Sequence, residues 1–232
     1  MRRSFSLVDH KVAEAAFFLG KIPDCGYDFF GVQCYVSAFA SSTRSITFAL
    51  QSVLSGLDGF AEWYEMRRQE LRGDPLARFF HEFRRVNQHI GDNLVNSSSG
   101  GPGEPTRYWF APTDDIPNVP NDDVHTSCKK YMVTITSLVY DCYIEFGPHI
   151  DGHQRYTEDY FRSIGKTIAD AEEENDFPRG WTDIGDSHAE AYRWQAIRDS
   201  VIGCEINDIF DEYLGKTMPI PERLPPYAPD GT

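Results

Sequence analysis

The residues best suited to chemistry lie close together between Phe79 and His89. This segment reads FFHEFRRVNQH and contains two histidines and two arginines. On a helix, His81, Arg85 and His89 follow one another at intervals of four residues and therefore share one face. An imidazole can take up and release a proton near neutral pH, and a guanidinium can bind phosphate or stabilise a charged transition state. This combination suits cleavage of a phosphodiester with the ribose 2′-hydroxyl as nucleophile, a reaction that needs no metal.

The same face has a second interpretation, because amphipathic helices commonly carry Arg and His on the side that meets solvent. His81, Arg85 and His89 would then be solvated and have no part in chemistry. Asn87 is different, since it falls on the apolar side of the helix and must find hydrogen-bond partners there. It is either a contact between packed helices or part of a site.

A helical hairpin is predicted to position this segment. Residues 75–94 form the helix that carries it, because apolar side chains recur every three or four positions. Asp74 is a suitable N-cap and Pro75 fits the first helical turn. A preceding helix over 60–72 ends at Gly73, so the two helices are expected to run antiparallel.

The rest of the chain also has mainly helical periodicity. We expect a flexible loop over 96–105 (NSSSGGPGEP), a short strand over 107–112 (RYWFAP), and further helices over 6–19, 30–56, 125–146, 154–175 and 187–214. The tail from Pro219 contains five prolines and is expected to be extended or disordered. The predicted fold class is all-α, with a helical bundle over 1–95, a linker over 96–124, an acidic helical region over 125–218 that packs on the bundle, and a Pro-rich tail over 219–232.

Charge is distributed unevenly along the chain. The net charge is −14, yet residues 1–95 carry 11 basic and 11 acidic side chains, and residues 96–232 carry 11 basic and 25 acidic ones. A chain this acidic is not a general nucleic-acid binder, since phosphate contacts supply most of the non-specific affinity. A nucleic-acid role would require a local basic surface in the first half. Residues 60–95 contain six arginines, but six acidic side chains offset them, so the electrostatic support for such a surface is weak.

The sequence gives little support for a metal site or for a membrane location. The five cysteines lie far apart with no CxxC pair, so we expect reduced, mostly buried thiols and neither a zinc ribbon nor a disulfide framework. His149 and His153 have metal-ligand spacing, but Pro148 and Gly152 indicate a loop there. No metal and no cofactor are therefore predicted. No secretory signal or membrane span is evident, which predicts a cytoplasmic protein that does not act at a membrane.

Two other features are assigned structural roles. The run from Glu172 to Glu174 is predicted to be a solvated helix face. Trp181 and Trp194 are expected to be core anchors, because large aromatic side chains usually supply buried area.

The segment from Asp74 to His89 resembles the HEPN superfamily of helical-hairpin domains. The resemblance rests on Asp74-Pro75-Leu76, on Phe80-His81-Glu82-Phe83-Arg84 and on His89, and it covers residues 30–95 best. The last core helix of such domains carries an Arg, four to six intervening residues and a His, and here Arg84 and His89 have four residues between them. The resemblance implies an all-α homodimer whose motif helices meet across the two-fold axis.

Many members of that superfamily are metal-independent RNases in toxin–antitoxin, phage-defence or RNA-processing systems. By this resemblance RNA is the substrate, an antitoxin is a possible partner, Arg84 stabilises the phosphate and His89 transfers protons. His81, Arg85 and Asn87 would be supporting groups. On an ideal helix Arg84 and His89 point about 140° apart, so they cooperate only across a dimer interface or on a distorted turn.

A second hypothesis comes from a different class, since many superfamily members are inactive binding modules. The chain would then be a non-catalytic, homodimeric protein-binding or regulatory module whose acidic half contacts a basic protein. Exposure separates the two hypotheses. A cleft lined by Arg84 and His89 at a two-fold interface favours the enzyme. The enzyme hypothesis fails if the two side chains are isolated on a convex surface or form ion pairs with Glu82 or Asp92.

Overall fold

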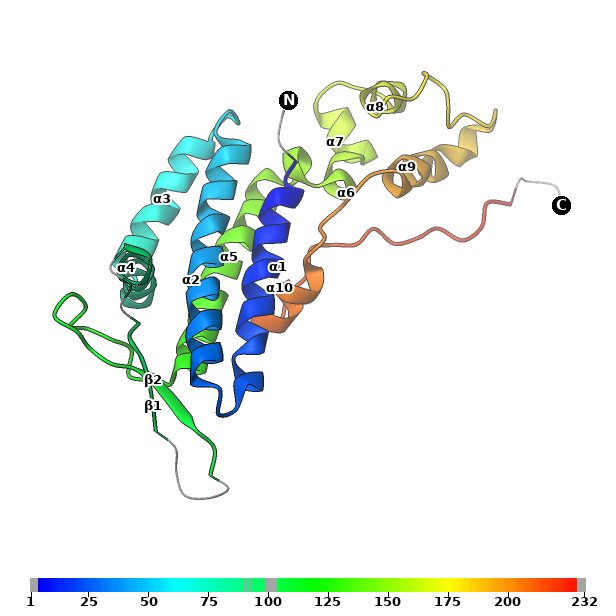
Figure 1. Cartoon of the computed structure of the whole chain (residues 1–232). Coiled ribbons are helices and arrows are strands. Elements are labelled where there is room, and N and C mark those ends of the chain that lie inside the picture. Colours follow the sequence, from blue (N-terminus) through cyan, green and yellow to red (C-terminus); the bar gives the residue numbers. More distant parts are fainter. Residues whose placement is uncertain (1–3, 90, 92, 99–103, 229–232) are drawn as a thin grey trace. The chain divides into compact units, whose positions relative to one another are not determined.

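Figure 1 shows the computed structural model of the chain, which describes residues 4–89, 91, 93–98 and 104–228. The chain forms two compact units. The first comprises Met1–Val139 and Asp208–Gly215, and the second comprises Tyr140–Asn207 and Lys216–Thr232. The described residues are mostly helical and contain one two-stranded sheet, which confirms the predicted all-α fold class.

The first unit begins with a pair of long helices, α1 (Ser6–Lys21) and α2 (Phe29–Leu54), which lie side by side in Figure 1. The short 3-10 helix η1 (Pro23–Cys25) lies in the turn between them. The Asp28 carboxylate caps α2 by accepting a hydrogen bond from the Gly31 N–H at 2.9 Å. Both helices agree with the periodicity of the sequence, apart from shifts of one or two residues at their ends.

The predicted hairpin is formed by α3 (Phe60–Gly73) and α4 (Pro75–His89). Asp74 begins α4 as expected, because its Oδ1 accepts hydrogen bonds from the N–H groups of Leu76 and Ala77 at 2.7 and 3.3 Å. The predicted end of this helix at residue 94 is wrong. Gly91 adopts a left-handed conformation with φ 85°, and its N–H bonds to the Val86 carbonyl, which ends the helix early.

The apolar face of α4 is anchored by aromatic packing. Phe80 stacks on Tyr131 at a centroid distance of 4.6 Å and meets Phe39 of α2 edge-on at 5.7 Å. Phe79 and Phe83 contact Phe110 at 4.7 and 5.6 Å. These contacts fix the rotation of α4 about its axis, so the opposite, polar face is presented to solvent.

A short hairpin of strands follows α4. The strands β1 (Val95–Ser98) and β2 (Arg107–Phe110) pair antiparallel, with Val95 opposite Phe110. The strand expected over 107–112 is therefore present, but the loop predicted from residue 96 is wrong for residues 96–98. Asn and Ser have little strand preference of their own, and the pairing comes from the partner strand. Residues 99–103 of that predicted loop lie outside the described residues.

Helix α5 (Val124–Ile150) starts in the first unit and ends in the second. It runs past the predicted end at residue 146 and includes Pro148 in its last turn. The loop predicted around His149 and His153 is consequently wrong, because His149 belongs to α5 and His153 to the short helix α6 (Gly152–Arg155). A proline this near a helix end disturbs few of the backbone hydrogen bonds of the helix.

The second unit is built from shorter helices than predicted. The continuous helix expected over 154–175 is wrong, since the chain forms α6, α7 (Glu158–Ser163) and α8 (Ile168–Glu174). Thr157 caps α7, because its hydroxyl oxygen accepts a hydrogen bond from the Tyr160 N–H. A capping box begins α8, where the Asp170 carboxylate accepts hydrogen bonds from the N–H and the hydroxyl of Thr167. Gly165 lies between these helices with a positive φ of 70°.

The helix expected over 187–214 is also interrupted. The structure contains η2 (Ser187–Ala189), α9 (Glu190–Asp199) and α10 (Asn207–Leu214), with residues 200–206 outside any helix. At Gly203 a Cβ atom would lie 2.2 Å from the His153 ring, so the chain passes too close to α6 there for any larger residue. Tertiary packing therefore overrides the helical periodicity of this stretch.

A separate apolar cluster supports the second unit. It consists of buried residues from α7, α8 and α9 and their flanks, namely Tyr156, Phe161, Ile168, Ala171, Trp194 and Ile197. Trp194 is thus a core anchor as predicted. Trp181 is not, because it is 65 % exposed and stacks on Phe177 at the surface. Beyond α10 the described tail has no helix or strand, and Gln195 accepts a hydrogen bond from the Leu224 N–H at 2.7 Å.

Candidate functional site

The polar face of α4 carries the predicted reactive side chains. His81, Arg85 and His89 are all exposed, as the spacing of four residues requires. Arg84 is half-buried on a different side of the helix. The solvent-facing side of α4 therefore presents two imidazoles and one guanidinium, separated by single helical turns.

Asn87 makes the helix-pairing contact that its position on the apolar side suggested. Its Oδ1 accepts a hydrogen bond from the Ser37 hydroxyl of α2 at 2.6 Å. One residue further on, the Gln88 amide donates to the Ser41 hydroxyl at 2.9 Å. These two polar contacts join α4 to α2 along the edge of the apolar interface.

Arg85 has an acidic neighbour on its own helix. Its Nε donates to Glu82 at 2.7 Å, and the imidazole of His81 lies 4.0 Å from the same carboxylate. All three side chains are about half exposed, and exposed pairs of this kind contribute roughly 0–1 kcal/mol. The guanidinium of Arg85 can therefore exchange this carboxylate for a phosphate at little cost.

Arg84 is not tied to Glu82. Its Nε is buried and has no hydrogen-bond partner among the described residues. A buried donor without an acceptor costs about 1–3 kcal/mol. Because this Nε atom is itself buried, only the exposed part of the half-buried Arg84 side chain can contact a ligand. Asp92, the other carboxylate considered for Arg84 or His89, lies outside the described residues. Within one chain nothing in the described part brings Arg84 and His89 together.

His81 lies in a place that the sequence did not reveal, since it lines a pocket of about 370 Å³. This cavity, here called the arginine pocket, is enclosed by α2, α3 and α4 with Tyr131 of α5. Its lining includes Arg44, Arg68, Arg72, Arg78 and His81. The clustering of arginines between residues 60 and 95 was the available signal, but which helix faces converge could not be read from it.

Two tyrosines of the arginine pocket have altered ionisation. Burial raises the pKa of Tyr131 to about 12, despite a hydrogen bond with Thr43 and the nearby positive charge of Arg44. Burial also raises the pKa of Tyr64, and it outweighs the hydrogen bonds that the phenol forms with Thr47 and Gln51. Both phenols are consequently neutral at physiological pH, so the positive charges of the pocket are not offset by them.

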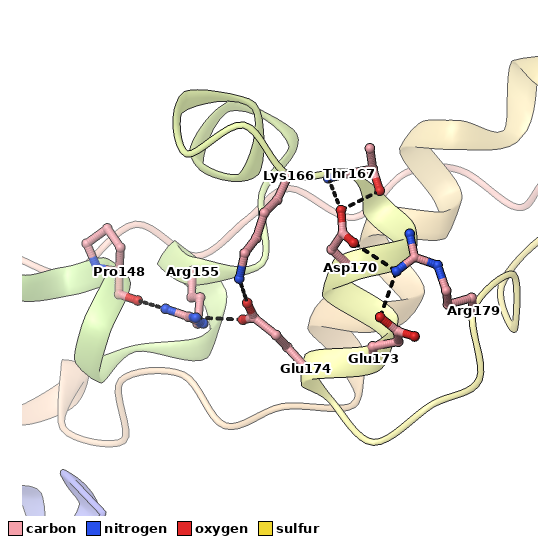
Figure 2. A network of polar contacts seen from close by, with 8 residues as sticks. All are labelled: Pro148, Arg155, Lys166, Thr167, Asp170, Glu173, Glu174 and Arg179. Atoms are coloured by element: carbon pink, nitrogen blue, oxygen red, sulfur yellow. Dashed lines mark hydrogen bonds and ion pairs between the residues drawn. The ribbon is translucent and has the colours of Figure 1, made fainter.

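The acidic run in the second unit is more organised than a solvated helix face. Glu172 is buried and accepts hydrogen bonds from the backbone of Gly180 and Thr182. Figure 2 shows the partners of its neighbours: Arg155 and Lys166 converge on Glu174, while Arg179 bridges Asp170 and Glu173. The prediction of a solvated charge run is therefore wrong for Glu172, and Glu173 and Glu174 are paired.

The five cysteines differ in their exposure to solvent. Cys128 and Cys142 are buried, but Cys25 and Cys204 are only partly buried and Cys34 is exposed, so the prediction of mostly buried thiols is wrong. In the ranges that the structure describes, no group of three or more His, Cys, Asp or Glu is placed to bind a metal ion. None of the helices described is both long and apolar enough to cross a membrane.

The chemistry available to α4 is thus proton transfer by exposed imidazoles and anion binding by guanidinium groups. The groups that can bind an anion are concentrated where the arginine pocket meets the polar face of α4, at His81. No model of a known protein family, no curated protein and no solved structure matches the chain.

Proposed function

We propose that the protein is a HEPN-like, metal-independent endoribonuclease whose active groups lie on α4. The observation that carries this proposal is the joint exposure of His81, Arg85 and His89 on one helix face, next to the half-buried Arg84. Among the arginines of α3 and α4, those that line the arginine pocket lie beside His81 and are the groups that would contact RNA phosphates on an otherwise acidic chain.

In the proposed reaction the ribose 2′-hydroxyl attacks the adjacent phosphorus. The bond to the 5′-oxygen breaks, which leaves a 2′,3′-cyclic phosphate and a free 5′-hydroxyl. His89 takes the proton of the 2′-hydroxyl and passes it to the departing 5′-oxygen, and Arg84 stabilises the charge that develops on the phosphate oxygens. His81 and Arg85 bind the flanking phosphates, and Asn87 supports the site by fixing α4 against Ser37.

A homodimer completes this proposed site. His81 and His89 are two turns apart, about 12 Å along the helix axis, so one chain does not place both imidazoles on a single phosphodiester. Arg84 and His89 also diverge by about 140° on an ideal helix. Pairing of two α4 helices across a two-fold axis brings His89 of one chain beside Arg84 of the other. In this proposal the protein acts in the cytoplasm, in a defence or toxin-like role with an antitoxin as partner.

The test is RNA cleavage by the purified full chain in EDTA. We expect cleavage by the wild type and a loss of about 100-fold or more in His89→Ala, the usual contribution of a general acid or base. His10→Ala is the matched control, since His10 is also an exposed helical histidine of the first unit. Cleavage that survives His89→Ala, or that disappears equally in His10→Ala, rules out this assignment.

The second candidate is a non-catalytic homodimeric binding module. The observation that favours it is the strongly acidic second unit. The second unit, with 17 acidic and 8 basic side chains, would bind a basic protein. A stable dimer in sedimentation that cleaves none of a broad set of RNAs supports this candidate over the nuclease.

A further inference from the structure

The tail that follows α10 is extended (Figure 1) and has a threefold pattern of exposure. Between residues 218 and 228, Met218, Pro221, Leu224 and Tyr227 are buried or half-buried, and the residues between them are exposed. A polyproline II helix has three residues per turn, so side chains three positions apart lie along one edge, whereas a β-strand alternates with a period of two. The pattern therefore indicates a polyproline II helix with one edge against the protein.

Proline favours this conformation locally. Its ring holds φ at about −65° and restricts the residue before it to extended backbone. Residues 218–221 and 224–226 are constrained in this way by Pro219, Pro221, Pro225 and Pro226. The tail thus has the conformation that polyproline-binding domains select before any partner arrives, which reduces the entropy lost on binding.

Contacts within the second unit hold the inward edge of the tail. The Leu224 N–H donates to the Gln195 side chain at 2.7 Å. The Tyr227 ring meets Tyr192 edge-on at a centroid distance of 5.0 Å, and its hydroxyl donates to the Asp186 carboxylate. Because this edge is attached to the unit, the other two edges of the tail are presented to solvent.

The two outward edges carry a recognition pattern. Arg223 and Pro226 lie on one of them, and Pro225 and Ala228 lie on the other. In the sequence Pro229 follows three positions after Pro226, so the tail contains an arginine with prolines three and six positions later. SH3 domains bind PxxP segments of this kind in grooves lined by aromatic side chains.

We propose that the tail binds the SH3 domain of a partner protein while it stays docked on the second unit. A polyproline II helix can place two adjacent edges in such a groove and turn the third away. The third edge here carries Leu224 and Tyr227, at positions that the PxxP pattern leaves open. The residues that the groove reads are therefore those that the protein leaves exposed. This proposal goes beyond the nuclease proposal, because it does not involve α4.

Arg223 determines the charge that the partner must have. Its side chain is 81 % exposed, and its guanidinium lies 3.6 Å from the exposed carboxylate of Asp199. Exposed pairs of this kind contribute little to stability, so the guanidinium can exchange Asp199 for a carboxylate of the partner. The SH3 groove is accordingly expected to be acidic at the end that receives Arg223.

The experiment is calorimetric titration of the full chain with purified SH3 domains that prefer ligands beginning with arginine. We expect one domain to bind per chain, and binding to weaken at high salt because the ion pair is screened. Arg223→Gln and Pro226→Ala should each weaken binding about ten-fold or more, since one loses a charge-assisted hydrogen bond and the other a ring that fills the groove. Arg223→Gln should also lose most of the salt dependence.

Two control variants should bind as the wild type does. Pro219→Ala changes an exposed proline of the same tail outside the pattern, and Arg162→Gln changes an exposed arginine of the second unit. No binding by these SH3 domains, binding unchanged in both test variants, or equal loss in a control overturns the proposal. Self-association of the chain that Pro226→Ala abolishes would assign the tail to a second copy and would overturn it as well. Failure of the nuclease proposal is measured separately, by cleavage in EDTA.

Discussion

Among single residues, Glu172 has the most demanding environment. Its side chain is 0 % exposed, yet it accepts hydrogen bonds from the Thr182 backbone N–H at 2.8 Å, from the Thr182 hydroxyl and from Gly180. Arg193 lies 3.4 Å away as its counter-charge. A buried carboxylate is tolerated only with such complete pairing. Glu172 therefore attaches the segment around Trp181 to α8.

Replacing Glu172 with Gln tests this attachment. The amide retains one acceptor, but its NH₂ group faces N–H donors, so we expect a loss of about 1–3 kcal/mol in the free energy of unfolding. Backbone amides of residues 180–182 should exchange with deuterium faster than in the wild type. Glu173→Gln is the control, since its exposed pair with Arg179 contributes less than about 1 kcal/mol. Equal exchange in the two variants would contradict the assigned role of Glu172.

At the level of elements, the first unit is the part that the sequence predicts well. Asp74, Pro75 and the apolar spacing of α4 are local signals, and the helix starts where they place it. The break before α10 depends instead on packing between distant segments, with Gly203 against His153. The arginine pocket was missed for the same reason, because its rim combines Arg44 with residues of α3 and α4.

Acid should weaken α8 and the segments that it pairs with. Hydrogen bonds from Thr167 and Arg179 lower the pKa of Asp170 from its usual 3.8 to about 2. Burial raises the pKa of Glu174, but the hydrogen bonds from Lys166 and Arg155 outweigh it, so the net change is a lowering from 4.5. Because these carboxyl groups are more acidic in the folded state, their stabilisation is complete above about pH 5 and declines as the pH falls toward 2.

Thermal unfolding followed by circular dichroism between pH 2 and 7 measures this effect. Asp170→Asn should lower the melting temperature at neutral pH. The melting temperature of this variant should also depend less on pH below about 4, because the variant lacks one carboxyl group whose pKa is lowered by folding. Asp159→Asn is the control, because Asp159 is exposed and forms no ion pair or side-chain hydrogen bond among the described residues. A wild-type melting temperature that stays constant from pH 5 to 2 would contradict the expected acid sensitivity.

For the whole molecule, charge and symmetry must be considered together. The first unit has 19 acidic and 14 basic side chains, so its basic groups act only where the fold concentrates them, at the arginine pocket and the polar face of α4. The half-buried Arg84 and the exposed His89 diverge on one helix. The proposed nuclease therefore depends on a second copy of the chain, and this dependence can be measured.

Complementation between two inactive variants provides that measurement. In a mixed dimer of Arg84→Ala and His89→Ala chains, a site that takes Arg84 from one chain and His89 from the other is intact once and doubly mutated once. Random pairing makes half of the dimers mixed, so co-refolded variants should recover about a quarter of wild-type cleavage. Each variant alone should remain inactive. If both groups acted from the same chain on a distorted turn, every site would lack one of them and mixing would restore nothing, which would exclude the shared two-fold site.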